Sequence, residues 1–589
     1  MWRIIKTFWQ ESKKYSWLWI LFLVFILIAS MCSLIAPYLM KRVIDALISV
    51  NNLTTAAGPR ILLMLIFWWF MVSLILVVIN GVRNFVFWTM VNKVYYQFSA
   101  DAFKKILRKD ITVFNKNKSG ELLHVFDDGG ESIWGVCHHV FNELFPQLVS
   151  FIFITVFALT VNWKLTLVLL AVIPIQIALS WYHYVATKHF SEKTRALWDK
   201  AFGIAGDVFQ NIHATKAYAR EQYESARLDN WFLRAVSIQL RANVRWMWAR
   251  MFDTYIIGEF AVLIAGALLV FNGEITVGTL VMFTSFVGTI LLPINMFAMG
   301  LQNNQKDATK FKKLEALLAE PETIVKTSGT HTQKKVQGAI TARHVSFGYG
   351  KKQVLSNISF NIKPGERIAL VGPSGAGKST LALLIARFYD PQKGTILLDG
   401  VDMRAWNYQN LREHIAVVWQ ENMLFHESLE FNVKYGDLHA TKNEIMAAAE
   451  RANIKDFILG QKKKLKTVVG ERGIYLSGGE KQRVMVARAI LRNADVIVLD
   501  EATSALDSIT ERHVQEGIRN LTQDKTSIII AHRLSTIKHV DRIFVVKNGK
   551  IIAAGPHEEL MNTCPLYHRM VDLQIHGVLQ EEEIKNPNQ

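Results

Sequence analysis

The chain has 589 residues, a formal net charge of +17 at pH 7 and a hydrophobic share of 51%. The length excludes a single domain, and the hydrophobic share exceeds that of ordinary soluble proteins. The three cysteines (Cys32, Cys137 and Cys564) lie outside the expected outer loops, so no disulfide framework is indicated.

Six apolar runs in the first half are long enough to cross a membrane, which takes about 20 helical residues for a hydrocarbon core of ~30 Å. Their length and near absence of charge do not fit buried helices of a soluble domain. We therefore predict an all-α transmembrane domain over residues 1–319, with the least defined boundary at the start of the third span and no cleavable signal peptide. The predicted spans are 17–40, 61–88, 145–161, 165–185, 255–271 and 280–301.

Basic residues indicate the orientation of these spans. Only Lys41, Arg42, Arg60 and Lys164 lie near the expected outer loops, and almost all other basic residues lie on the opposite side. Because positive charge accumulates on the cytoplasmic side, we expect a multi-pass protein of the bacterial inner membrane with both termini in the cytoplasm. This asymmetry and contact with the anionic lipid bilayer account for the net charge, so nucleic acid is not an expected partner.

The two long loops, 89–135 and 186–250, are polar but compatible with helices. Spans two to five are therefore expected to extend into the cytoplasm as helices, broken near 114–122 and 206–212. A linker at 320–338 separates the two halves, and 576–589 is expected to form a disordered tail.

A glycine-rich segment, 372–380, follows an apolar strand-like run at 368–371 and precedes a helix-like run at 381–388. In this context successive backbone amides and a helix N-terminus can surround phosphate groups. Lys378 can reach the β- and γ-phosphates, and the Ser379 hydroxyl can ligate Mg²⁺. The sequence therefore predicts that ATP or another nucleoside triphosphate binds here. The predicted phosphate-binding residues are Gly372, Pro373, Ser374, Gly375, Ala376, Gly377, Lys378, Ser379 and Thr380.

Further segments stand in a fixed order around this loop: 345–349 upstream, then 418–420, 476–480, 496–501, 504–507 and 531–533. Together they resemble the nucleotide-binding domain of ABC transporters over residues 339–575, which implies an α/β P-loop fold. The most specific segment is Leu-Ser-Gly-Gly at 476–479, which lies between the two nucleotide-binding motifs.

The resemblance implies a role for each segment. Glu501, directly after the apolar run that ends at Asp500, is the expected general base for water, and His532 contacts the γ-phosphate. Tyr349 is expected to stack on adenine. Gln420 senses the metal and the attacking water. The expected Mg²⁺ ligands are Ser379, Gln420 and Asp500.

Three residues of the Leu-Ser-Gly-Gly segment, the next residue Glu480, and Asp507 are expected to complete the ATP site of a second subunit. Position 480 departs from the family pattern, because it carries glutamate where glutamine is more common, and we expect a modest effect on ATP turnover. The residues of this signature group are Ser477, Gly478, Gly479 and Glu480.

The architecture implied is an exporter-type half-transporter, which functions as a homodimer or, alternatively, as a heterodimer. ATP binding and hydrolysis would drive alternating access through the two cytoplasmic helix breaks, which resemble coupling helices. The expected substrate is a hydrophobic or amphipathic small molecule or lipid, as in multidrug and lipid-flippase exporters. An importer of the same fold and an ATP-gated channel or regulator are the alternatives.

Charged residues in or beside the spans are candidates for substrate contact. Arg83 lies near the inner end of span two, where it can also extend its charge to the interface. Glu143 and Glu259 point to cationic substrates. Arg241 and Arg245 share a helix face, but Arg250 is rotated away, so no phosphate-binding cluster is predicted there.

Overall fold

The computed structural model folds into two compact units. The first contains Met1–Leu107 and Asn117–Glu320, and the second contains Arg108–Lys116 and Pro321–Gln589. The second unit thus includes a short segment from the first predicted helix break. The structure describes residues 1–48, 58–117, 119–251, 254–322, 328–350, 352–420, 423–500, 508–531 and 540–576.

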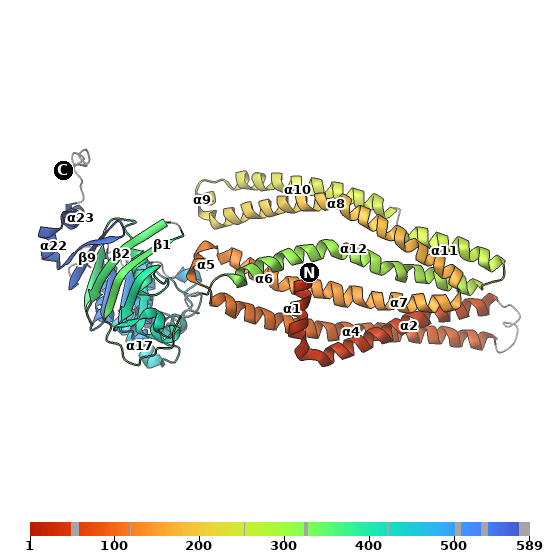
Figure 1. Ribbon diagram of the computed structural model, residues 1–589, viewed down its shortest axis with the longest axis horizontal. Coiled ribbons are helices and arrows are strands. Elements are labelled where there is room, and N and C mark those ends of the chain that lie inside the picture. Colours follow the sequence, from red (N-terminus) through yellow and green to blue (C-terminus); the bar gives the residue numbers. More distant parts are fainter. Residues whose placement is uncertain are drawn as a thin grey trace. The chain divides into compact units, whose positions relative to one another are not determined.

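The first unit is helical in its described residues (Figure 1). All six predicted spans lie in helices, and the third coincides with α7, which has Pro146 in its first turn. A 3₁₀ helix, η1 (Lys13–Tyr15), and a π-helix, η2 (His138–Leu144), connect longer helices. The helices are α1 (Trp2–Ser12), α2 (Ser16–Ile48), α4 (Gly58–Leu107), α6 (Ser119–Cys137), α7 (Phe145–Val161), α8 (Trp163–Gln210), α9 (Ile212–Ala217), α10 (Glu221–Met251), α11 (Thr254–Phe271) and α12 (Val277–Ala319).

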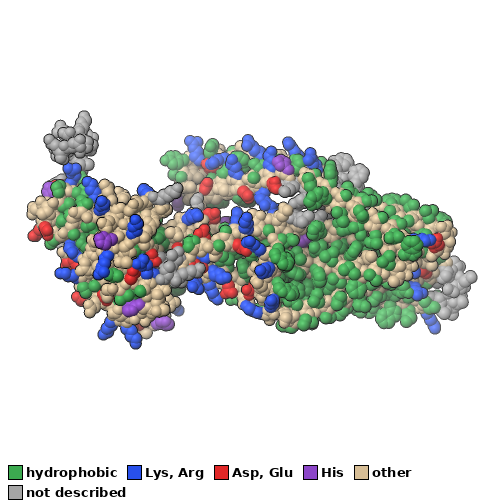
Figure 2. Space-filling model, in the orientation of Figure 1, with side chains coloured by type: hydrophobic (Ala, Val, Ile, Leu, Met, Phe, Trp, Pro, Cys, Tyr) green, Lys and Arg blue, Asp and Glu red, His purple; other side chains and the backbone are tan. Residues whose placement is uncertain are grey.

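Length and hydropathy support membrane insertion of this unit. Figure 2 shows hydrophobic side chains covering one part of it and charged side chains gathered on the other. The fifth predicted span corresponds to a shorter apolar helix, Ile256–Phe271. Within the described residues, the stretches long and apolar enough to cross a membrane are Trp2–Ile48, Pro59–Leu107, Gly120–Val161, Trp163–Tyr182 and Val277–Ile294.

The helix breaks differ in detail from the prediction. In the first, α5 (Ile111–Lys116) already begins before residue 114. In the second, α8 continues through Gly206 to Gln210, because one glycine costs a helix only about 1 kcal/mol. The break occurs instead at Asn211 (φ −108°, ψ 28°), after which α9 forms.

Two apolar clusters hold the first unit together. One joins α1, α2, α4 and α6, and in it Ile4 and Phe8 of α1 are buried with Phe22 and Phe87. Ile4 and Phe8 are four positions apart and so share one face of α1, whereas Trp2 and Trp9 on other faces are exposed. The second cluster joins α7, α8, α11 and α12 around residues such as Phe283.

The second unit contains a six-stranded sheet of order β10-β9-β3-β8-β7-β6 and a four-stranded antiparallel sheet of order β2-β1-β4-β5. The pairs β9–β3, β3–β8, β8–β7 and β7–β6 are parallel. These central strands are almost wholly buried, which explains their continuous apolar sequences. The strands are β1 (Ile340–Tyr349), β2 (Lys352–Ile362), β3 (Arg367–Val371), β4 (Lys393–Leu398), β5 (Val401–Asp402), β6 (Ile415–Val418), β7 (Val496–Asp500), β8 (Thr526–Ile530), β9 (Arg542–Lys547) and β10 (Lys550–Gly555).

Helices flank these sheets. The predicted helix at 381–388 is α14, which begins earlier and ends at Ile385. It ends because Arg387 adopts φ +50° and buries its guanidinium, which donates to the Met403 carbonyl at 2.7 Å. The other helices are α15 (Tyr408–His414), α16 (Leu429–Lys434), α17 (Lys442–Arg451), α18 (Lys455–Gly460), α19 (Gly478–Arg492), α20 (Ser508–Thr522), α22 (His557–Thr563) and α23 (Pro565–His576), with 3₁₀ turns η3 (Met403–Ala405), η4 (Lys464–Lys466) and η5 (Glu471–Gly473).

The later part of the predicted linker is bound to the second unit. The backbone N–H of His331 donates to the Ala405 carbonyl (3.0 Å), and that of Gln337 donates to the Asp399 carboxylate (2.6 Å). His414 approaches the Gln333 carbonyl at 2.8 Å. Described linker residues therefore reach the sheet along its surface.

Candidate nucleotide-binding site

The site lies where parallel strands end. In α/β sheets, ligands bind beyond the carboxyl ends of the strands. Here β3 leads into the glycine-rich loop, β7 ends at Asp500, and Gln420 follows β6. The register of these strands therefore gathers residues that are far apart in the sequence.

The conformation of the loop requires glycine. Gly377 precedes α14 with φ +103°, a left-handed conformation that favours glycine. A Cβ at Gly372 would lie 2.1 Å from the Val546 carbonyl oxygen. Both positive φ values and close backbone approach thus keep this loop tight against its neighbours.

The loop borders a cavity of about 660 Å³, within the usual size range of ligand pockets. Lys378 is buried, and its Nζ donates to the carbonyl oxygens of Gly372 (2.7 Å) and Pro373 (3.0 Å). Its charge is therefore held beside the α14 N-terminus, which favours a bound anion. The lining residues are Lys352, Gln353, Val354, Ser374, Gly375, Gly377, Lys378, Ser379, Thr380, Gln420, Asp500, Asn548 and Gly549.

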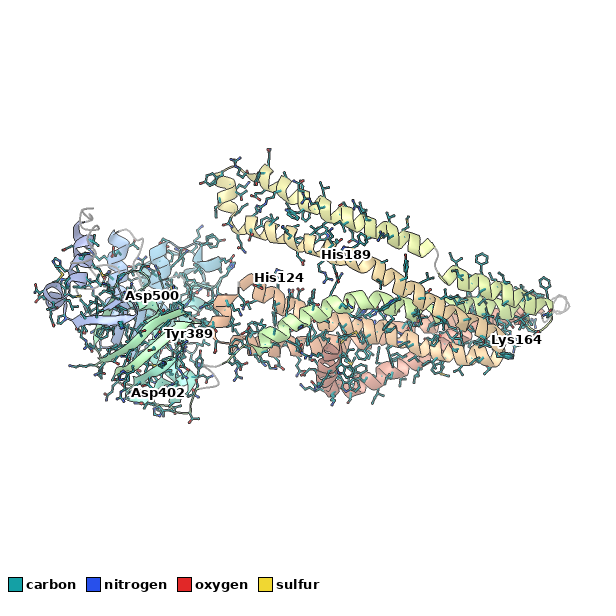
Figure 3. The ribbon with its side chains drawn as sticks, turned by 45° about the horizontal axis from the view of Figure 1, so that its top comes forward. His124, Lys164, His189, Tyr389, Asp402 and Asp500 are labelled. Atoms are coloured by element: carbon teal, nitrogen blue, oxygen red, sulfur yellow. The ribbon has the colours of Figure 1, made fainter. Side chains whose placement is uncertain are left out.

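All three predicted Mg²⁺ ligands line this cavity. They come from three elements: Ser379 from α14, Gln420 from the segment after β6, and Asp500, which is labelled in Figure 3, from β7. Hydroxyl, amide and carboxylate oxygens suit a hard cation. No group of three His, Cys, Asp or Glu side chains in the described part of the chain could hold a metal ion. The donor set therefore fits Mg²⁺ that is bound together with phosphate oxygens.

Tyr349 is not among the residues that line this cavity. Its hydroxyl lies 3.5 Å from Thr380 Oγ1, and its ring packs edge-to-face against Tyr389, with centroids 5.5 Å apart. Tyr349 as a whole is 42% exposed. The predicted adenine-stacking residue thus has an accessible ring beside the phosphate loop.

Sequence reasoning missed the β9–β10 turn as part of the site. Asn548 and Gly549 line the cavity, and the Gly549 N–H donates to the Ala376 carbonyl at 3.1 Å. An Asn-Gly pair between apolar runs is a strong hairpin signal, so the turn itself was predictable. Its contact with the phosphate loop depends on the pairing of β9 with β3, which no local pattern encodes.

The signature residues form a helix N-terminus. Ser477 is the N-cap of α19, and its hydroxyl accepts from the Glu480 N–H at 3.4 Å. Glu480 Oε2 accepts in turn from the Ser477 N–H at 2.7 Å. Ser477 and Gly478 are exposed, whereas Gly479 is buried. The substituted position 480 therefore supports the helix start, and Gly478, the first residue of α19, stays exposed.

Three predicted residues, Glu501, Asp507 and His532, lie outside the described residues, and their roles stay predictions. The strands that lead to the first and last of them are described. β7 and β8 pair in parallel, with Asp500 opposite Ile530.

Helix α5 belongs to the same unit as the nucleotide site. Asn115 Nδ2 donates to the Tyr389 hydroxyl at 3.2 Å, and Ile111 packs against the apolar core of the sheet. The buried Lys109 side chain pairs with Glu322 at 2.9 Å. The predicted coupling segment is thus attached to the nucleotide-binding unit at several points.

The three substrate candidates lie on different elements of the first unit. Arg83 on α4 has a buried Nε without a hydrogen-bond partner among the described residues. Glu143 in η2 faces His138 and His139. Glu259 on α11 is half-buried, and the described residues give it no recorded hydrogen bond or ion pair. No direct contact joins the three in the described structure.

Comparisons with known proteins agree with this arrangement. Residues 355–504 match the family model "ABC transporter", and residues 19–294 match "ABC transporter transmembrane region". The chain is 35% identical over 476 residues to an "ATP-dependent lipid A-core flippase" of Pseudomonas putida, covering 80% of this chain and 78% of the relative. It is 35% identical over 520 residues to a protein of the same description from Thiobacillus denitrificans, covering 85% and 87%.

A solved structure described as a bacterial Atm1-family ABC exporter with ATP bound superposes with a TM-score of 0.83 and 26% identity. The match covers 94% of this chain and 98% of that one. The predicted order of a helical transmembrane domain followed by an α/β ATPase domain is confirmed.

Proposed function

Because the chain belongs to the ABC transporter family, we propose that it is a homodimeric flippase, which moves a lipid whose headgroup carries an anionic phosphate across the bacterial inner membrane. It is an integral membrane protein that couples ATP hydrolysis to export. The lipid, the dimer and the membrane are the proposed parts. The names of the relatives support the lipid, and the charge distribution of the sequence supports the orientation.

The main support for an anionic phosphate in the headgroup is Arg83. Its guanidinium donates to Asn84 Oδ1 at 3.3 Å, but its Nε is buried without a partner in the described residues. A cation inside a membrane span is costly unless an anion or water balances it. A phosphate group would supply that charge and accept from the free N–H.

The nucleotide site supplies the driving force. Lys378 and the amides around it bind the phosphates, and Ser379, Gln420 and Asp500 would hold Mg²⁺, which neutralises phosphate charge when bound. Glu501 is the proposed base, which takes a proton from the attacking water, while His532 orients the γ-phosphate. The exposed α19 N-terminus of a second copy would close the site. Helix α5 would transmit that closure to the membrane helices.

Flipping assays with purified protein in liposomes test the proposal. Arg83→Gln should slow ATP-dependent movement of labelled phosphatidylglycerol about tenfold, because it removes a charged hydrogen bond, and leave basal ATPase activity intact. The matched control is Lys105→Gln, an exposed cation on the cytoplasmic extension of the same helix, α4. Equal rates in Arg83→Gln and wild type would contradict an anionic headgroup at Arg83. Movement toward the ATPase side would instead identify an importer.

A further inference from the structure

A second polar cavity, of about 300 Å³, lies in the membrane unit between η2 and α12. Because η2 directly precedes α7, the cavity lies at the N-terminal end of span three, where α6 leads into it. It is remote in sequence from every nucleotide-binding residue. Its lining residues are Gly135, His138, His139, Glu143, Asn304, Lys306 and Asp307.

Both histidines direct Nδ1 toward one carboxylate. His139 Nδ1 lies 2.9 Å from Glu143 Oε2, and His138 Nδ1 lies 3.5 Å from Glu143 Oε1. Asn142 Nδ2 lies 3.3 Å from His138 Nε2 and can donate to it, which leaves the Nδ1 hydrogen for Glu143. This network assigns Nδ1–H to His139 as well, so that its Nε2 is an acceptor.

The α12 side of the cavity adds unsatisfied acceptors. Asn304 is only 8% exposed, and its Oδ1 is buried without a hydrogen-bond partner in the described structure. Asp307 is half-buried, and no described residue forms a hydrogen bond or an ion pair with its carboxylate. Burial raises the pKa of Asp307, against the opposing effect of Lys310 and Lys306. A cationic donor would satisfy both side chains.

Two glycines allow the helices on either side of the cavity to pack closely together. A Cβ at Gly135 would lie 2.6 Å from Asp307 Oδ2, and one at Gly300 would lie 1.8 Å from His139 Nε2. Glycine at these two positions therefore allows α12 to approach α6 and η2. The π-helical geometry of η2, which often marks functional sites, contributes His138, His139 and Glu143 to one wall.

The charge and the volume of the cavity indicate which kind of ligand it can bind. Its lining contains two carboxylates, Glu143 and Asp307, and one lysine, Lys306. Asp128 and Glu131 nearby make the potential more negative, and Lys310 partly balances them. The described residues offer no group of three metal-ligating side chains. The volume corresponds to roughly ten water molecules at ~30 Å³ each, which leaves room for a small organic group.

We propose that this cavity binds a primary ammonium group, whose N–H donors are accepted by Asp307, Asn304 and Glu143. Phe87 of α4 contacts His138 edge-to-face (6.1 Å), and Arg83 lies one helical turn before Phe87 on the same face. An aminophospholipid could thus place its ammonium in the cavity and its phosphate toward Arg83. The lipid source of the ammonium rests on the proposed flippase function.

Binding without nucleotide tests this directly. The full-length protein is titrated with phosphatidylethanolamine or phosphatidylcholine of identical acyl chains, and bound lipid is measured by native mass spectrometry. Phosphatidylcholine is the matched probe because its trimethylammonium group carries no N–H. We expect at least tenfold tighter binding of phosphatidylethanolamine. Asp307→Asn should remove about tenfold of that preference, whereas Asp101→Asn, an exposed carboxylate on α4, should leave it unchanged.

Asn304→Leu is the second variant, since it keeps the side-chain size and removes the acceptor. It should also reduce the preference, which keeps the test decisive if Asp307→Asn does not fold. Competition by soluble ethanolamine, with no difference between the lipids, would support an ammonium site with a soluble ligand. Equal affinity for both lipids without ethanolamine competition, or binding of Zn²⁺ alone, would overturn the proposal. Lost flipping with retained lipid preference would contradict only the proposed function.

Discussion

The amide of Asn115 donates a hydrogen bond of 3.2 Å to the phenol of Tyr389 and thereby joins helix α5 to the nucleotide site. The Tyr389 ring packs on Tyr349, whose hydroxyl lies 3.5 Å from Thr380 in the first turn of α14. Burial raises the pKa of Tyr389 still further above neutral pH. A short path of contacts therefore links the expected adenine position to the expected coupling segment.

Replacement of Asn115 tests this path. Asn115→Ala removes one hydrogen bond, worth about 0.5–1.5 kcal/mol, and should leave ATP affinity nearly unchanged. We expect the stimulation of ATPase activity by transported lipid to fall severalfold relative to basal activity. Thr112→Ala, an exposed change on the same helix, is the control. Normal stimulation in Asn115→Ala would show that coupling does not use this contact.

Because Glu501 and Lys378 have different proposed roles, their variants should differ in ATP binding and in turnover. Glu501→Gln should retain ATP binding and lower turnover by 10² or more, because the proposed general base is lost. Lys378→Ala should weaken ATP binding itself, because it removes the buried cation beside the phosphate loop. Nucleotide binding and steady-state hydrolysis, measured side by side, separate the two effects. Substantial turnover by Glu501→Gln would mean that another residue is the base.

The glutamate at position 480 gives a third prediction. Glu480 accepts from the Ser477 N–H at 2.7 Å, a bond that glutamine can also make through its carbonyl oxygen. Glu480→Gln should therefore keep the cap but remove a negative charge near the expected γ-phosphate. A change of about 0.3–1 kcal/mol would lower the KM for ATP up to about fivefold. An unchanged KM would show that this charge does not face the nucleotide.

The ion pair between Arg367, the first residue of β3, and Asp541, just before β9, makes a pH-dependent contribution to the stability of the fold. Burial opposes ionisation of Asp541, but hydrogen bonds from the Arg367 side chain and backbone outweigh it and lower the Asp541 pKa. The stabilisation is therefore complete above the unfolded pKa, about 3.9, and is lost as pH falls through the lower folded value. Asp541→Asn should lower the Tm of the full-length protein at neutral pH. This difference from wild type should shrink in melts below pH 4, and a difference that stays constant would contradict the assignment.

Local sequence patterns predicted the elements that local physics determines. Residues 145–161 form α7 as predicted, since an apolar run ends at Asn162, whose side chain caps the next helix. The strand before the glycine-rich loop was also predicted, and the predicted metal ligands Gln420 and Asp500 line the phosphate cavity.

Features that depend on distant contacts could not be predicted in the same way. The helix continues through Gly206 because tertiary packing along α8 and α10 exceeds the cost of one glycine. The cavity at Glu143 needs Asn304 and Asp307, which lie more than 150 positions away on α12. From the sequence, Glu143 is a candidate for contact with a cationic substrate, and only the fold brings the α12 acceptors beside it.

The last prediction concerns Glu259 on α11. It is half-buried inside a span, and no hydrogen bond or ion pair is recorded for it among the described residues. The neighbouring Gly258 faces Val287 and Val172, and Glu259 lies about 100° further round α11. A carboxylate in this setting is costly unless it meets water or a cation. We therefore expect it to contact the cationic part of the transported molecule.

Glu259→Gln should slow transport of lipids with an ammonium group, such as phosphatidylethanolamine, more than that of phosphatidylglycerol. Basal ATPase activity should stay close to wild type, because the change leaves side-chain size intact and lies outside the ATPase unit. Glu274→Gln, which removes an exposed ion pair with Lys164, is the matched control. Equal slowing of both lipids, or a loss of folding, would assign Glu259 a structural role, because only a substrate contact distinguishes lipids by charge.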